Sequence, residues 1–177
     1  MNNYAYILDG KAYINLTNKC SNACTFCIRN TGDGVKDTVL WLDDEPTDGK
    51  AVLSAFDALG FEGREVVFCG YGEPTENLSV LKAVARELKS RGYFLRLNTN
   101  GLGNLTSGRN IAPELKDIDV VSVSLNNCSK EKYLAVTQSL FGLKAFDGVL
   151  EFAACCKAAN IDVIFTVVDV IGEKDIA

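Results

Sequence analysis

The segment Cys20-Ser21-Asn22-Ala23-Cys24-Thr25-Phe26-Cys27 follows a short strand-like stretch, residues 12–16, near the start of the chain. Its cysteines have the spacing C-x-x-x-C-x-x-C. Three thiolates at this spacing can bind three irons of a cubane [4Fe–4S] cluster and leave the fourth iron without a protein ligand, whereas a cluster that only carries electrons is normally held by four cysteines. An open metal position is typical of a catalytic metal site. The spacing therefore indicates chemistry at a cluster.

Outward from this segment, strand-like and helix-like stretches alternate along the chain. Residues 4–8 and 12–16 flank the turn dipeptide Asp9-Gly10 and predict an N-terminal β-hairpin. Further strands are expected at residues 64–69, 94–98, 120–125 and 161–168, and helices at residues 48–60, 77–92, 113–116 and around 146–153. This alternation predicts an α/β fold with a largely parallel sheet and right-handed crossovers. No repeat or linker divides it, so residues 1–177 are expected to form one domain.

Unusual residues gather where the expected strands end. The first strand runs into the cysteine segment, the second into residues 70–74 (G-Y-G-E-P) and the third into residues 98–101 (N-T-N-G). The fourth ends near Ser122, Ser124, Asn126 and Asn127, and the fifth near residues 169–172. Ligands bind beyond the carboxyl ends of parallel strands, in open sheets and in barrels alike. One shared site is therefore predicted at this edge of the sheet.

The composition disfavours several classes of function. The formal net charge is −5 and no run of Lys and Arg stands out, so nucleic-acid binding is unsupported. The chain has no histidine, which removes the usual general base and the imidazole metal ligand, and the chemistry must come largely from a cofactor. No apolar stretch is long enough for a membrane span. Seven cysteines without a visible export signal indicate a reducing cytoplasm.

The cysteine segment and the G-x-G-E-P segment together resemble the radical S-adenosylmethionine (SAM) superfamily. More narrowly, residues 24–30 (C-T-F-C-I-R-N), 68–74 (F-C-G-Y-G-E-P) and 97–101 (L-N-T-N-G) resemble the small radical SAM proteins associated with TatD-type nucleases. The resemblance runs over nearly the whole chain and implies a partial (β/α)6 TIM-like barrel. Only five parallel strands can be placed, so the last β/α unit is expected to be missing. The sheet edge left open could then be covered by a second subunit, as in a homodimer.

The resemblance also implies roles for particular residues. Cys20, Cys24 and Cys27 would ligate three irons, and the amino and carboxylate groups of SAM would bind the fourth. Phe26 and the backbone of Val170 and Gly172 would contact the adenine of SAM. The residues near its methionine end would be Gly70, Tyr71, Gly72 and Glu73. Those at its carboxylate or ribose would be Asn98, Asn100, Ser122, Ser124 and Asn126. The superfamily pattern G-x-I-x-G-x-x-E after the fifth strand is only partly kept here, and no role follows for Asp175.

The function implied is that of a radical SAM enzyme. A [4Fe–4S] cluster, reduced by a flavodoxin or ferredoxin, would cleave SAM into methionine and a 5′-deoxyadenosyl radical that abstracts hydrogen from a substrate. That substrate, a small molecule, a nucleotide or a partner protein, stays open. Two alternatives remain: a non-catalytic iron–sulfur redox module, and a structural zinc site with Cys69 or Cys128 as fourth ligand. Zinc sites more often pair two C-x-x-C units or use histidine.

Overall fold

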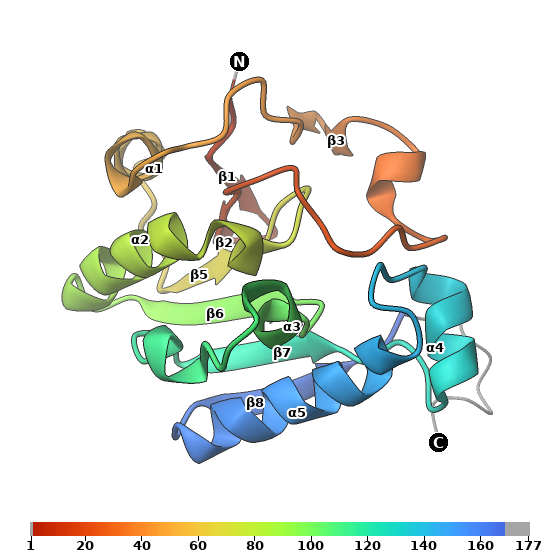
Figure 1. Cartoon of the computed structure of the whole chain (residues 1–177). Coiled ribbons are helices and arrows are strands. Elements are labelled where there is room, and N and C mark those ends of the chain that lie inside the picture. Colours follow the sequence, from red (N-terminus) through yellow and green to blue (C-terminus); the bar gives the residue numbers. More distant parts are fainter. Residues whose placement is uncertain (1, 169–177) are drawn as a thin grey trace.

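The computed structural model of the chain describes residues 2–168, and a six-stranded sheet with the order β1-β2-β5-β6-β7-β8 forms its centre (Figure 1). Strands β1 (Ala5–Leu8) and β2 (Lys11–Ile14) pair antiparallel across Asp9-Gly10, and both turn residues have positive φ, as such a tight turn requires. The next four strands run parallel to β2: β5 (Glu65–Phe68), β6 (Phe94–Thr99), β7 (Val120–Ser124) and β8 (Asp162–Thr166). A separate small ribbon consists of β3 (Gly34–Val35) and β4 (Thr38–Val39).

Helices connect the parallel strands. They are α1 (Gly49–Ala58), α2 (Leu78–Ser90), α3 (Gly103–Ser107), α4 (Lys130–Thr137) and α5 (Lys144–Ala158), with 3-10 turns η1 (Ile28–Asn30), η2 (Pro74–Asn77) and η3 (Ala112–Leu115). Figure 1 shows α2, α3 and α5 on the same side of the sheet, and α4 at the end toward which the parallel strands point. The cysteine segment reaches the same end.

The two faces of the sheet differ in character because side chains alternate along each strand. One face carries fully buried apolar side chains such as Phe68, Leu97 and Val121, which belong to the main hydrophobic core together with residues of α2 and α5. The other face carries Asn98 and Ser122, which are register partners on β6 and β7. The helices therefore cover the apolar face, and the other face is polar near the carboxyl ends of the strands.

The expected strands and helices are present, with ends shifted by a few residues. Asp48 begins α1, and its carboxylate accepts a hydrogen bond from the Lys50 N–H at 2.8 Å. Asn77 directly precedes α2, and its side chain makes no capping hydrogen bond to this helix. A 3-10 turn leads directly into α2, and the Asn77 amide instead donates to the carbonyls of Leu16 and Pro46.

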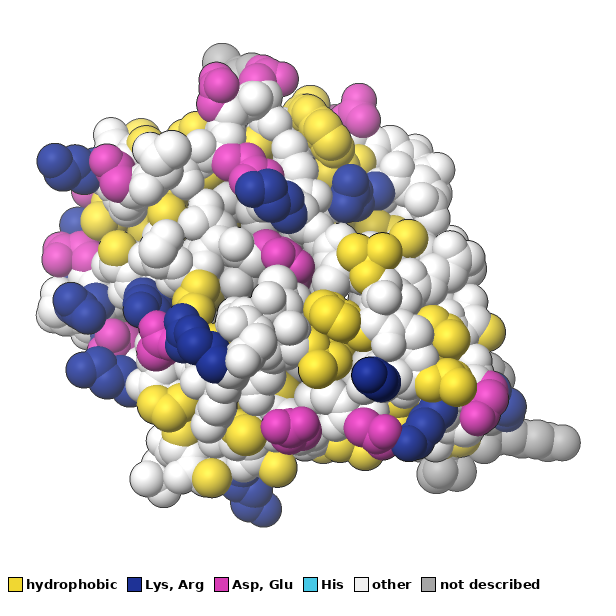
Figure 2. Space-filling model, in the orientation of Figure 1, with side chains coloured by type: hydrophobic (Ala, Val, Ile, Leu, Met, Phe, Trp, Pro, Cys, Tyr) yellow, Lys and Arg dark blue, Asp and Glu magenta, His cyan; other side chains and the backbone are white. Residues whose placement is uncertain are grey.

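The surface carries both signs of charge. Figure 2 shows Lys and Arg side chains interspersed with Asp and Glu on the face drawn, without a continuous basic area there. No helix within residues 2–168 has the length and apolar character that a membrane span requires. The positions expected for the backbone of Val170 and Gly172 lie outside the described residues.

Candidate active site

The cysteine segment is held on one side by the turn after β5. The N–H groups of Gly72 and Glu73 donate to the carbonyls of Thr17 and Lys19 at 2.9 and 2.7 Å. A Cβ atom at Gly72 would lie 2.4 Å from the Lys19 carbonyl oxygen and 2.5 Å from that of Thr17. Glycine is therefore required here because two backbone segments touch. The expected approach of SAM to Gly72 stays a prediction.

Gly70 and Tyr71 of the same turn are fixed by a buried side chain of the strand-end segment. A Cβ atom at Gly70 would lie 2.0 Å from Asn15 Oδ1. The same oxygen accepts a hydrogen bond from the Tyr71 N–H at 3.2 Å, and Asn15 is fully buried. Asn15 thus aligns the turn after β5 with the end of β2, a role that its sequence position alone did not indicate.

On its other side the cysteine segment is held by the end of α4. The N–H groups of Ala23 and Thr25 donate to the carbonyls of Thr137 and Val136 at 3.0 and 2.9 Å. The segment after the helix adds a bond from the Leu140 N–H to the Ser21 carbonyl at 3.0 Å. Helix α4 is absent from the sequence-based expectations, yet its last two residues accept two of the backbone hydrogen bonds that hold the cysteine segment.

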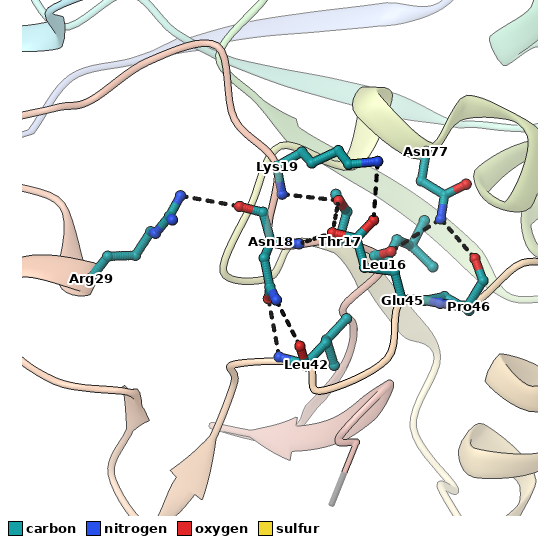
Figure 3. Close-up of polar contacts among 9 residues, drawn as sticks. All are labelled: Leu16, Thr17, Asn18, Lys19, Arg29, Leu42, Glu45, Pro46 and Asn77. Atoms are coloured by element: carbon teal, nitrogen blue, oxygen red, sulfur yellow. Dashed lines mark hydrogen bonds and ion pairs between the residues drawn. The ribbon is translucent and has the colours of Figure 1, made fainter.

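The start of the loop after β2 is fixed by residues 42–46, as Figure 3 shows. The Glu45 carboxylate accepts hydrogen bonds from Thr17 Oγ1 and from the Asn18 N–H, both at 2.8 Å. The Asn18 side chain exchanges two hydrogen bonds with the backbone of Leu42, at 2.8 and 3.0 Å. The Asn18 carbonyl in turn accepts a bond from Arg29 at 3.1 Å.

The three cysteines face one cavity of about 460 Å³, a volume typical of small-molecule sites. Its lining consists of Cys20, Asn22, Ala23, Cys24, Cys27, Arg29, Asn30 and Tyr71. None of the seven cysteines forms a disulfide. Burial raises the pKa of Cys20 to about 11 and that of Cys24 to about 12, so both are neutral thiols before any metal binds.

The donor set fits an iron–sulfur cube better than a single ion. Within residues 2–168, no three Cys, Asp or Glu side chains are close enough to hold one metal ion. Tetrahedral zinc with Zn–S bonds of about 2.3 Å would bring its sulfurs to within about 3.8 Å of one another. A cube binds each thiolate through a different iron, so its ligands stand further apart. Neither Cys69 nor Cys128, the candidates for a fourth zinc ligand, lines this cavity.

Glu73 joins the ends of β5 and β6 beside the first cysteine. Glu73 is 4 % exposed. Its carboxylate accepts three hydrogen bonds at 2.7 Å, from the Thr75 hydroxyl, the Thr99 hydroxyl and the Asn100 N–H. The Thr75 N–H donates a fourth, at 3.2 Å. Burial raises the pKa of Glu73, against the effect of these bonds. The Asn100 amide nitrogen lies 3.3 Å from Ser21 Oγ and 3.8 Å from Cys20 Sγ.

The remaining candidate residues lie on the polar face or at the strand ends. Asn98 Oδ1 and Asn126 Oδ1 are buried and have no hydrogen-bond partner within the described part of the chain, which is uncommon for buried polar atoms. Ser122 is buried and Ser124 half-buried on β7. Phe26 is half-buried and is not among the residues that line the cavity. Two unpartnered amide oxygens near the ends of β6 and β7 suit a ligand with hydroxyl groups.

Arg29 is a cavity residue to which the sequence alone assigned no role. Its guanidinium carbon lies 5.8 Å from the ring centre of Trp41 and 5.6 Å from that of Tyr71. The two rings meet edge to face at 6.0 Å, and the Tyr71 hydroxyl donates to the Gly32 carbonyl. The only sequence signal for Arg29 is its place two residues after the last cysteine.

The structure thus combines a largely parallel α/β domain with three thiols in one cavity at the carboxyl ends of its strands. This arrangement suits a protein that binds an iron–sulfur cluster and a second ligand. The chain belongs to the radical SAM superfamily, whose family model matches residues 14–176. Proteins of this superfamily use a [4Fe–4S] cluster and SAM, and their enzymes need an electron donor such as flavodoxin or ferredoxin.

Two solved structures share the fold. The chain is similar to anSMEcpe with bound AdoMet, with a TM-score of 0.61 and 20 % identity over 88 % of this chain and 42 % of that one. It is also similar to TYW1 with a lysine-pyruvate adduct bound, with a TM-score of 0.50 and 11 % identity over 93 % of this chain and 67 % of that one. The chain thus spans about two fifths of the length of anSMEcpe. The comparison with curated proteins gave no match.

Proposed function

We propose that this chain is a radical SAM enzyme with Cys20, Cys24 and Cys27 as ligands of a [4Fe–4S] cluster. The observation that carries the proposal is the shared cavity of these three thiols at the carboxyl ends of the parallel strands, in a chain of this superfamily. When bound, the reduced cluster would supply one electron to cleave SAM into methionine and a 5′-deoxyadenosyl radical, and this radical would take a hydrogen atom from the substrate.

The surrounding residues would bind and orient SAM. Glu73 Oε2 accepts one hydrogen bond within the described residues, from Asn100, and so keeps a lone pair for the SAM ammonium group, a charge-assisted contact. The Asn100 amide beside Cys20 would favour the thiolate form of that ligand. The unpartnered oxygens of Asn98 and Asn126 would accept hydrogen bonds from the ribose hydroxyls. No histidine is needed because none of these tasks requires a group that titrates near neutral pH.

Our proposal includes a partial (β/α)6 TIM-like barrel for the single domain. Strands β2, β5, β6, β7 and β8 are neighbours in chain order, as in a barrel, whereas the order reverses in a doubly wound sheet. Helices α2, α3 and α5 lie on the apolar face, which would be the outside of such a barrel. Within residues 2–168, β8 is an edge strand with Ile164 and Phe165 nearly half exposed. This edge is where a second copy of the chain could pair.

Membership of the TatD-associated group, a cytoplasmic location and reduction by a flavodoxin or ferredoxin belong to the same proposal. Membership of the TatD-associated group rests on the C-T-F-C-I-R-N and G-Y-G-E-P segments. Both segments line one cavity, through Cys24, Cys27, Arg29, Asn30 and Tyr71. The location rests on seven cysteines that form no disulfide, a state that a reducing compartment maintains.

The test is anaerobic reconstitution followed by dithionite and SAM. The native chain is expected to form 5′-deoxyadenosine and methionine slowly without its substrate. Cys24→Ala should abolish product formation, whereas Cys155→Ala, which changes a half-buried cysteine of α5 outside the cavity, should retain it. A zinc-only metal content after anaerobic purification, or a cluster signal that SAM leaves unchanged, would contradict the proposal. The second result would favour a redox module.

A further inference from the structure

Arg29 is an exposed residue of the cysteine cavity whose guanidinium is held by three contacts. The rings of Trp41 and Tyr71 lie within cation–π distance of its guanidinium, and one N–H donates to the Asn18 carbonyl at 3.1 Å. Asn18 is itself fixed by Leu42, next to Trp41 in the chain. An arginine ordered in this way before it meets a ligand loses little side-chain entropy when it binds one.

Arg29 has no ion-pair partner in the part of the chain that the structure describes. No carboxylate within residues 2–168 forms an ion pair with Arg29, although Arg91, Arg96 and Arg109 each form at least one. Apart from the bond to Asn18, its N–H groups make no hydrogen bond within the described part of the chain. Of the described residues that line the cavity, Arg29 alone carries a permanent charge. A planar guanidinium with free N–H groups is suited to a carboxylate or a phosphate.

We propose that Arg29 binds an oxyanion of the substrate, a carboxylate or a phosphate group, at the entrance of the cysteine cavity. This inference rests on the proposed function and adds a substrate class to it. The substrate rather than SAM is the expected partner because of where the groups lie. Glu73 and Asn100, to which we assign the polar end of SAM, adjoin Cys20 and are buried or half-buried, whereas Arg29 is exposed and follows Cys27.

Trp41 provides a direct reporter for this site. It is the only tryptophan of the chain, is 43 % exposed, and lies against the Arg29 guanidinium. An anion that binds Arg29 should therefore change the tryptophan emission. The experiment titrates the reconstituted full chain with inorganic phosphate and, separately, with acetate, at constant ionic strength maintained with chloride. Each titration is run with and without saturating SAM.

Three variants are compared. Arg29→Gln should raise the apparent Kd for the anion by about tenfold or more, the loss expected for a charged hydrogen bond. Arg29→Lys keeps the charge and loses the planar fork, so an intermediate Kd is expected. Arg64→Gln is the matched control, because Arg64 is exposed and precedes β5, at the end of the strand away from the cavity. It should bind as the native chain does.

The outcomes are decisive in either direction. An emission change that depends on Arg29 and persists with SAM bound supports the proposal, and the stronger of the two ions identifies the chemical source of the oxyanion. No change in emission, or equal changes in Arg29→Gln and the native chain, overturns it. An effect that saturating SAM abolishes also overturns it, since Arg29 would then serve the SAM carboxylate. Formation of 5′-deoxyadenosine in the same samples reports separately on the proposed function.

Discussion

Replacing Gly72 with alanine should displace the cysteine segment and cost a large part of the stability of the fold. The added Cβ would lie 2.4 Å from the Lys19 carbonyl oxygen, and real Cβ contacts stay above 3.0 Å, so backbone must move by at least about 0.6 Å. Overpacking of this kind costs about 1–3 kcal/mol. The hydrogen bonds from Gly72 and Glu73 to Thr17 and Lys19 are strained as well, at about 1 kcal/mol each. We expect a loss of about 3–5 kcal/mol.

Urea unfolding of the chain without metal measures this cost. With a slope of about 2 kcal/mol per molar urea, the midpoint should fall by about 1.5–2.5 M, and iron uptake on anaerobic reconstitution should fall with it. Gly32→Ala is the matched control, because a Cβ there meets nothing within 4 Å and its φ is not positive. If Gly72→Ala matched Gly32→Ala in both midpoint and iron content, the reasoning from close backbone approach would be refuted.

Two further substitutions test the electrostatics of the fold and the site. Asn100→Ala removes the amide beside Cys20 Sγ and should lower the midpoint potential of the reconstituted protein. The reason is that hydrogen bonds to the ligand sulfurs stabilise the reduced, more negative cluster. A redox titration followed by EPR measures this potential. Burial acts to raise the pKa of Glu65, but hydrogen bonds from Lys11 and Arg96 hold it below its ordinary value of 4.5. Its contribution to the unfolding free energy is therefore present above about pH 4.5 and lost as the pH falls through the lower folded value. When the pH falls from about 5 to 3, the unfolding free energy of Glu65→Gln, measured with urea, should therefore fall less than that of the native chain. An equal fall would contradict a stabilising role for the ionised Glu65 carboxylate.

The sequence predicts the elements that carry their own local signal. The parallel strands are short apolar runs bounded by turn residues, and the helices α2 and α5 each show an apolar stripe, so both could be predicted. Helix α4 could not, because only Tyr133 and Thr137 of its eight residues are buried and no stripe results. It is stabilised by contacts with residues 23–25, more than a hundred positions earlier in the chain.

The candidate site likewise contains residues that a local sequence pattern predicts and residues whose position depends on distant segments. The cysteine spacing and the G-x-G-E-P segment are local patterns tied to one chemistry, and the structure brings both to one cavity. Arg29 carries no such pattern, since its place depends on Trp41 and Tyr71, which come from two other segments. The sequence predicts Gly72 only as a contact of SAM, whereas the close backbone of residues 17–19 is what requires glycine at this position in the structure.

The support of the cysteine segment from both sides also sets an order of events during synthesis. All three thiols have left the ribosome once residue 27 has emerged, but the carbonyls of Val136 and Thr137 that hold the segment arrive more than a hundred residues later. Until then a nascent chain presents unsupported thiols that soft metals can capture. Under the proposed function, a cluster bound by all three thiols would find its supported site only after the last turn of α4 has been synthesised.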